Sequence, residues 1–291
     1  MITIKKKSKQ KNLIFLLFLA PSLVGFLMFY LVPFVISICY SFFDSPVNGS
    51  FVGLKNYTSL LSNGIFQKAG LNTLIFTAIC VPLNMLLSLL LAMLLNRAIY
   101  FRNIFRTFFI IPLVIPVASV VLVWQVLFDY NGTINAFLYE WGFTSLNWMN
   151  SSWARVVVIV MYLWKNIGYN MVLFLAGLQS IPVEYYESAE IDGASQIKKF
   201  IKITIVYLTP TTFFVFIMSI INSFKAFRET YIISGSYPHE SIYMLQHYMN
   251  NMFTSLDYQK LTSAACIMAV VIFSLVYIMF NIERRISKSI S

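Results

Sequence analysis

The chain has 291 residues, of which 59% are hydrophobic and only 11% are charged, with a formal net charge of +10. Because soluble domains carry about 25% charged residues, this composition excludes an ordinary soluble protein. The apolar stretches are long and continuous, which excludes a transmembrane β-barrel and predicts an all-α, polytopic integral membrane protein.

Six apolar stretches are long enough for transmembrane helices, which need about 20 residues each. They lie at 13–40, 71–95, 107–128, 153–178, 203–224 and 261–282, and together predict a membrane domain over 13–282. A basic segment precedes this domain at 1–12, and another follows it at 283–291. The first apolar stretch is longer than the core of a cleaved signal peptide, which has about 7–15 residues. We therefore expect it to be retained as a helix.

Lysine and arginine residues concentrate at 1–12, 96–106, 179–202 and 283–291, all on one side of the six predicted spans. Cytoplasmic segments carry an excess of these residues, so both termini are expected in the cytoplasm. The positive net charge is therefore explained by cations that flank spans in membrane lipid. Nucleic acid is not expected as a partner. The three cysteines and two histidines lack the spacing of a disulfide framework or a metal site, and no metal is expected.

The densest charge in the chain lies at 182–202, between the fourth and fifth predicted spans. Three glutamates recur every three residues between 184 and 190 and therefore share one face of a helix that begins after Pro182. Gly193 permits a backbone reversal, and Ser195 can cap a second, lysine-bearing helix. The pattern predicts a helix–turn–helix along the membrane surface. It is either an ordinary amphipathic loop or an element that docks into a groove on a soluble partner.

This segment resembles the EAA signature of ABC importer permeases. Glu187-Ser188-Ala189 is followed after three residues by Gly193 and after nine more by Ile203. Similarity to the sugar-importer branch, of the maltose and multiple-sugar type, extends over nearly the whole chain, including Phe51-Val-Gly-Leu-Lys-Asn-Tyr57, Asn72-Thr73 and Leu175-Ala-Gly-Leu-Gln179. Ser188 replaces the usual alanine, and Ile205-Val206 replace Leu-Pro, which predicts a straighter start of the fifth span.

The resemblance implies a type I ABC importer permease fold and a transport subunit rather than an enzyme. Such a subunit would form half of a translocation path for a carbohydrate in the bacterial cytoplasmic membrane. The implied partners are a second homologous permease subunit, two ATPase subunits and an extracytoplasmic sugar-binding protein. This chain would bind no cofactor, because ATP and magnesium belong to the ATPase. The implied ATPase-coupling residues are Glu184, Tyr186, Glu187, Ser188, Ala189, Asp192, Gly193 and Ala194.

Polar and aromatic side chains in or beside the predicted spans are candidates for a substrate path, because polar groups at membrane depth are usually functional. The candidates are Asn84, Gln125, Trp164, Asn170, Asn222 and Phe227. Amides and aromatic rings suit an uncharged, hydroxyl-rich sugar. The competing interpretation is that buried amides join neighbouring helices, and for any single residue this second interpretation is favoured.

Four charged residues near the fourth and fifth spans are harder to interpret. Lys165 lies near mid-span and either belongs to the substrate path, extends its ammonium toward water or pairs with a partner chain. Lys225, Arg228 and Glu229 follow the fifth predicted span and either line the mouth of the path or form a solvated helix end. The solvated helix end is favoured, because exposed ion pairs contribute little.

Two other classes of membrane protein remain as alternatives. A stand-alone secondary transporter for a small polar solute would show inverted repeats and acidic residues within its spans. No aspartate or glutamate falls inside the six predicted spans. A membrane-embedded enzyme would need a nucleophile with its base, or a metal cluster, and the spans contain neither pattern.

Overall fold

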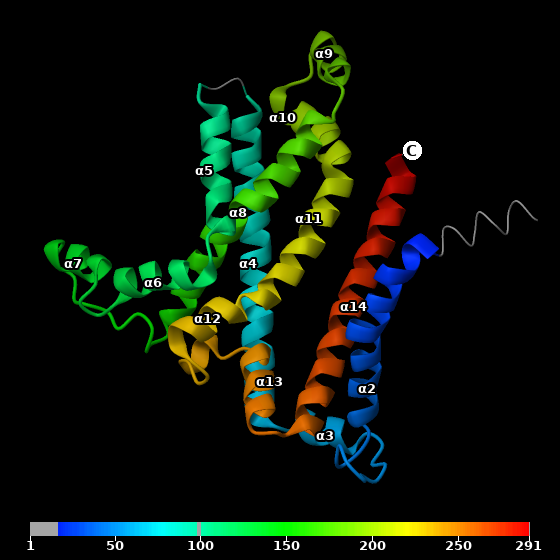
Figure 1. Ribbon diagram of the computed structural model, residues 1–291. Coiled ribbons are helices and arrows are strands. Elements are labelled where there is room, and N and C mark those ends of the chain that lie inside the picture. The colour runs from blue at the N-terminus through cyan, green and yellow to red at the C-terminus, as the bar shows by residue number, and fades with distance from the viewer. Residues whose placement is uncertain (1–16, 98–99, 291) are drawn as a thin grey trace, which may run out of the picture. The chain divides into compact units, whose positions relative to one another are not determined.

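The computed structural model describes residues 17–97 and 100–290 (Figure 1). The predicted basic segment at 1–12, the first four residues of the first predicted span and Ser291 lie outside the described residues. Residues 17–26 are helical and continue into η1 (Leu27–Leu31). The following elements are α2 (Val32–Tyr40), α3 (Lys55–Leu61), α4 (Gly64–Asn96), α5 (Arg102–Val114), α6 (Val117–Phe128), α7 (Thr133–Glu140), α8 (Ala154–Gln179), α9 (Val183–Ile191), α10 (Gln196–Lys199), η2 (Phe200–Thr204), α11 (Ile205–Lys225), α12 (Phe227–Ser234), η3 (Glu240–Ile242), α13 (Leu245–Thr254) and α14 (Tyr258–Ile290).

The predicted all-α membrane fold is confirmed. Within the described part of the chain, six helical segments are long and apolar enough to cross a membrane. They are Leu17–Tyr40, Gly64–Asn96, Val117–Glu140, Ala154–Gln179, Gln196–Ser234 and Tyr258–Arg285. The same part of the chain contains no strand, only an isolated bridge between Phe43 and Phe51.

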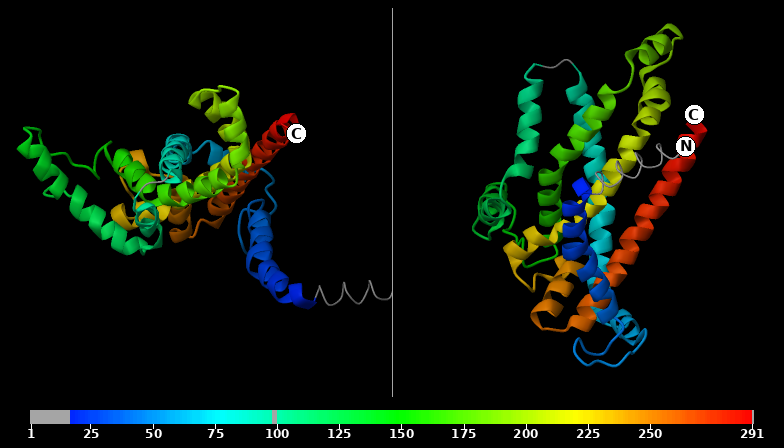
Figure 2. Two further views of the ribbon diagram at one scale, coloured as in Figure 1. Left: turned by 90° about the horizontal axis from the view of Figure 1, so that it is seen from above. Right: turned by 45° about the vertical axis from the view of Figure 1, so that its right-hand side comes forward.

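The apolar stretch at 107–128 is divided into two helices rather than one. α5 ends at Val114, Ile115 and Pro116 have extended ψ angles of 134° and 136°, and α6 begins at Val117. Proline disfavours a helical conformation at the residue before it, which explains the break at Ile115. α5 runs along α8, whereas α6 and α7 extend sideways from α4, α8 and α11 (Figures 1 and 2).

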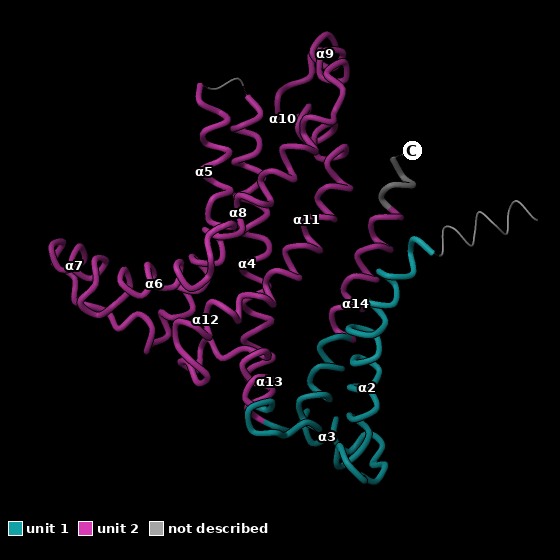
Figure 3. The backbone as a smooth tube through the Cα atoms, viewed as in Figure 1, with its two compact units in different colours: residues 1–63, 252–269 teal, residues 64–251, 270–291 magenta. Residues whose placement is uncertain are grey.

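The chain forms two compact units (Figure 3). The first contains residues 1–63 and 252–269. Its 51–57 motif closes the turn after α2, because Asn56 donates from Nδ2 to the carbonyls of Ser41 (2.9 Å) and Phe43 (2.8 Å). The hydroxyls of Tyr57 and Ser41 also lie 2.6 Å apart. The motif therefore has a structural role in this unit.

The second unit contains residues 64–251 and 270–291 and is built around α4, α8 and α11. Buried apolar side chains from these helices form a continuous core, including Ala92, Phe174 and Leu208. α5 packs closely on α8 at Gly168, where an added Cβ would lie only 1.8 Å from the carbonyl oxygen of Phe109. Only glycine permits this approach of two backbones.

Asn72 and Thr73 fasten the loop before α13 to α4. Asn72 donates from Nδ2 to the carbonyls of Glu240 (2.7 Å) and Tyr243 (3.0 Å), and Thr73 Oγ1 accepts from the Leu245 amide (2.9 Å). This loop and α13 lie at the opposite end of α4 from α9 and α10 (Figure 1). The arrangement leaves 182–202 at one end of the second unit.

Candidate functional site

The predicted helix–turn–helix at 182–202 is present. α9 is followed by a reversal at Gly193, whose φ angle is +71°. The Gly193 amide donates to the Glu190 carbonyl (3.0 Å), and the Ala194 amide donates to the Ala189 carbonyl (2.9 Å). This pair of bonds is the Schellman arrangement that ends many helices, with glycine at its left-handed position. Ser195 then caps α10 by accepting from the Lys198 amide at 3.3 Å.

The segment is tied to the start of α11 by side chains. The hydroxyl groups of Tyr186 and Thr204 are hydrogen-bonded at 2.9 Å. The ring centroids of Tyr185 and Tyr207 lie 5.0 Å apart. Within the segment, Lys199 Nζ lies 3.1 Å from Glu190 Oε2 and so connects α10 to α9. A displacement of α9 would therefore be transmitted directly to α11.

The start of the fifth span is helical without the Leu-Pro pair. α10 continues through the π-helical turn η2 into α11. The missing proline therefore leaves an uninterrupted helical path, but one with a wider turn rather than a straight α-helix. Such π-turns occur frequently at functional sites.

Most of the segment is open to contact. No residue of α9 is buried, and Ile191 and Ile197 are 88% and 73% exposed. Of the predicted coupling residues, Glu184, Glu187, Ser188, Asp192 and Gly193 are exposed, and Tyr186, Ala189 and Ala194 are half-buried. The exposed side chains of this segment are available for contact with another protein. The two isoleucines were not among the predicted coupling residues, although each interrupts a polar run.

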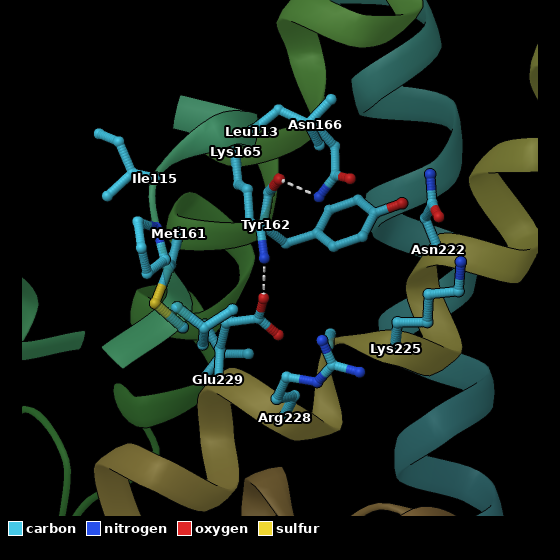
Figure 4. Close-up of a pocket in the computed structure, with 14 residues that line it drawn as sticks. Leu113, Ile115, Met161, Tyr162, Lys165, Asn166, Asn222, Lys225, Arg228 and Glu229 are labelled. Atoms are coloured by element: carbon cyan, nitrogen blue, oxygen red, sulfur yellow. Dashed lines mark hydrogen bonds and ion pairs between the residues drawn. The ribbon is translucent and has the colours of Figure 1, made fainter. Parts of the chain in front are cut away.

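A second feature is a cavity of about 400 Å³ inside the second unit (Figure 4). It lies between the α5–α6 break, the middle of α8 and the junction of α11 with α12. Its lining residues are Leu113, Ile115, Pro116, Val117, Val158, Met161, Tyr162, Lys165, Asn166, Asn222, Lys225, Ala226, Arg228 and Glu229. The lining thus combines three cations and one carboxylate with amides and apolar walls.

Lys165 and Glu229 form a buried ion pair between α8 and α12 (Figure 4). Two expectations are therefore wrong. Lys165 binds Glu229 of the same chain instead of extending to water or pairing with a partner chain, and Glu229, only 7% exposed, does not belong to a solvated helix end. Lys225 and Arg228 are exposed, as expected for a solvated helix end. The reason is the change of direction after α11: α11 ends at Lys225, Ala226 follows, and α12 brings Glu229 to Lys165 of α8.

The ion pair also bears on the acidic residues of the spans. No aspartate or glutamate lies within the predicted bounds, but the helical segment Gln196–Ser234 runs past the end predicted at 224 and includes Glu229. Its carboxylate is paired, as buried charges usually are.

Residues 84–288 match the family model of the binding-protein-dependent transport system inner membrane component. The chain belongs to this family. It is 35% identical over 230 residues to the arabinooligosaccharides transport system permease protein AraP of Bacillus subtilis (strain 168), covering 75% of this chain and 71% of the relative. It is also 30% identical over 253 residues to the sulfoquinovosyl glycerol transport system permease protein SmoG of Agrobacterium fabrum (strain C58 / ATCC 33970), covering 84% and 82%.

The fold agrees with this membership. A chain from the crystal structure of a bacterial ABC transporter involved in the import of the acidic polysaccharide alginate superposes with a TM-score of 0.84. The match covers 97% of this permease and 99% of that chain, at 23% sequence identity. The resemblance noted in the sequence is thereby confirmed: the protein is a multi-pass membrane permease of the ABC importer type.

Two predicted substrate-path residues of this permease lie in a hydrogen-bond network that joins three helices. Asn170 on α8 donates from Nδ2 to Asn84 Oδ1 on α4 (2.5 Å) and to Ser219 Oγ on α11 (2.7 Å). Ser88 donates to the same Asn84 oxygen (3.2 Å) and to the Ile167 carbonyl (2.9 Å). Both asparagines are almost fully buried, which suits interhelical bonding.

The other four predicted path residues are dispersed. Asn222 lines the charged cavity. Gln125 on α6 donates to the Ile233 carbonyl (3.4 Å); Trp164 packs against Trp124, and Phe227 against His247. The structure thus brings Asn222 to the cavity and separates it from the rest, and substrate contact by any of the six stays a prediction.

The charged cavity is also lined by Met161, Tyr162 and Asn166. They recur at helical spacing on α8, but nothing in the chain order indicates that the α11–α12 junction faces them. In residues 17–97 and 100–290, no group of three His, Cys, Asp or Glu side chains is placed to hold a metal ion.

Proposed function

We propose that this permease forms half of the translocation path of an ATP-driven carbohydrate importer, with 182–202 coupling it to a separate ATPase subunit. The observation that carries the proposal is the exposed helix–turn–helix bound to α11. The carbohydrate class is supported by relatives named for arabinooligosaccharides and sulfoquinovosyl glycerol. Relatives named for sn-glycerol-3-phosphate extend the range to phosphorylated polyols.

The geometry of 182–202 explains how coupling would work. α9 presents its glutamates and Ile191 outward, so it can enter a groove on a partner as a short helix. Tyr186 holds α9 to Thr204, and Lys199 holds α10 to Glu190. A rigid-body movement of the ATPase would therefore move α9 and α11 together, as interface-driven transitions commonly do.

The proposed assembly contains a second homologous permease subunit, two ATPase subunits and an extracytoplasmic sugar-binding protein. ATP and magnesium would bind to the ATPase subunits, and this chain would bind no cofactor. The proposed location is the bacterial cytoplasmic membrane, with both termini and 182–202 in the cytoplasm. The distribution of lysine and arginine along the sequence supports this orientation.

The test is substitution of Gly193 in the complete transporter. Gly193 has a φ angle of +71°, and a Cβ there would meet no atom within 4 Å. Gly193→Trp therefore adds bulk at the proposed docking face without an internal clash. Gly142→Trp is the matched control. Gly142 ends α7 in the same Schellman arrangement, with a φ angle of +82° and no atom within 4 Å of an added Cβ, so both variants carry the same backbone strain.

We expect Gly193→Trp to abolish both co-purification of the ATPase and ATP-dependent sugar uptake into proteoliposomes. Membrane insertion should be normal in both variants, and Gly142→Trp should keep its ATPase. Normal co-purification and uptake by Gly193→Trp at wild-type expression would refute the coupling role.

A further inference from the structure

The charged cavity has an excess of positive charge. Lys165 is neutralised by its ion pair with Glu229, whereas Lys225 and Arg228 have no ion-pair or hydrogen-bonding partner among the residues that the structure describes. Both are exposed where α11 ends and α12 begins, so a ligand that enters the cavity can reach them.

The carboxylate of Glu229 is only partly satisfied. Its Oε1 receives the Lys165 ammonium, but its Oε2 is buried without a hydrogen-bonding partner. Leaving a buried acceptor unpaired costs free energy, so a donor is missing at this wall of the cavity. Figure 4 shows Glu229 and Arg228 on the same side of the cavity, with Lys225 and Asn222 nearby.

The cavity has the size and lining of a ligand site. Its volume of about 400 Å³ lies in the range of small-molecule pockets. Tyr162 is held with its ring at the wall, because its hydroxyl donates to the Ser219 carbonyl at 3.0 Å. The matching ligand would carry hydroxyl donors for Glu229 and an acidic group for the two cations.

We propose that this cavity is a substrate subsite for acidic saccharides. Lys225 and Arg228 bind the carboxylate, sulfonate or phosphate group, and Glu229 Oε2 accepts a sugar hydroxyl. The proposal rests on the proposed function and narrows its substrate class. An acidic group can form charge-assisted hydrogen bonds with both cations, which a neutral saccharide cannot do, so the cavity favours acidic ligands.

The experiment uses the purified complete transporter and two matched pairs of probes. Digalacturonate is compared with neutral galactobiose, and glucose 6-phosphate with glucose. The apparent affinity of each is measured from the rise in Tm at constant ionic strength. We expect an acidic probe that fits the cavity to bind at least about tenfold more tightly than its neutral counterpart, because charge-assisted hydrogen bonds are strong. The two pairs distinguish a carboxylate from a phosphate specificity.

The double variant Lys225→Gln/Arg228→Gln should lose this preference while keeping its basal Tm, since neither side chain has a partner in the fold. Lys225→Arg/Arg228→Lys should retain it, and Lys55→Gln, an exposed cation on α3, should have no effect. Equal binding of acidic and neutral probes, or an unchanged preference in the double variant, would overturn the proposal. So would loss of the second permease from the double variant, since the cations would then pair with that subunit.

Failure of this inference differs from failure of the proposed function. ATP-dependent uptake restricted to neutral saccharides, and indifferent to Lys225 and Arg228, would refute the subsite alone. Absence of a co-purifying ATPase together with absence of ATP-dependent uptake of any saccharide would refute the proposed function itself.

Discussion

The contact between α5 and α8 at Gly168 leads to a sharp mutational prediction. A Cβ on residue 168 would lie 1.8 Å from the carbonyl oxygen of Phe109 and 2.4 Å from its carbonyl carbon. Real Cβ contacts essentially never fall below 3.0 Å, so α5 would have to move away by at least about 1.2 Å. Because both atoms belong to the backbone, no side-chain rotation relieves the clash.

Overpacking of this kind destabilises the fold by about 3 kcal/mol. Alanine in place of glycine within a helix stabilises the helix by about 1 kcal/mol. Gly168→Ala should therefore reduce the free energy of unfolding by about 2 kcal/mol, which corresponds to a Tm lower by about 5 °C. Tryptophan fluorescence during heating in detergent measures this shift. The matched control is Gly25→Ala, whose Cβ would meet nothing within 4 Å and whose Tm should be equal or higher.

A displaced α5 should also impair transport, because Leu113 and Ile115 at its end line the charged cavity. Uptake in proteoliposomes should fall together with the Tm. A Tm for Gly168→Ala within 1 °C of the wild-type value would contradict the close approach of the two helices.

Burial lowers the pKa of His247, in α13 outside the six candidate spans, to about 4 from 6.5. As the pH falls from 6.5 to 4, the unfolded state binds a proton that the folded state does not bind. The free energy of unfolding should therefore decrease over this range, by up to about 3 kcal/mol. His247→Gln should flatten that part of a Tm–pH profile. Lys165→Met leaves Glu229 buried without its cation and should cost about 3 kcal/mol or more, whereas Lys165→Met/Glu229→Leu should recover most of the Tm. Asn170→Leu removes the bonds to Asn84 and Ser219 and should lower the Tm by the equivalent of about 2 kcal/mol, while Asn222→Leu, at the cavity wall, should spare the Tm and reduce uptake.

The coupling segment could be predicted from the sequence because its determinants are local. Gly193 and Ser195 lie in adjacent turns, and each specifies its own backbone conformation through φ freedom or capping. The exposure of Ile191 was harder to predict from the sequence, since hydrophobic residues are ordinarily assigned to the protein interior. Its position between two polar residues was the available signal.

The charged cavity could not be predicted in the same way. Lys165 and Glu229 are separated by 64 residues, and their pairing depends on how α12 turns after Ala226. Ala226 itself has helical angles, with φ −61° and ψ −16°, so its own conformation does not mark the change of direction. α12 packs against α6, a contact between parts of the chain that are distant in sequence. A prediction that ended the fifth span at 224 inevitably assigned Glu229 to solvent.

α11 connects the two candidate sites. It begins one residue after Thr204, which is bonded to Tyr186 of the coupling segment, and it ends at Lys225, which lines the cavity. Its 21 residues span about 31 Å at 1.5 Å per residue. Beyond Ala226, by contrast, Glu229 is held to α8 by Lys165. A tilt of α11 would therefore move Lys225 relative to the fixed carboxylate, changing the charge presented to a saccharide. Coupling between distant sites requires an element with two such arrangements, and α11 is the element that we expect to provide them.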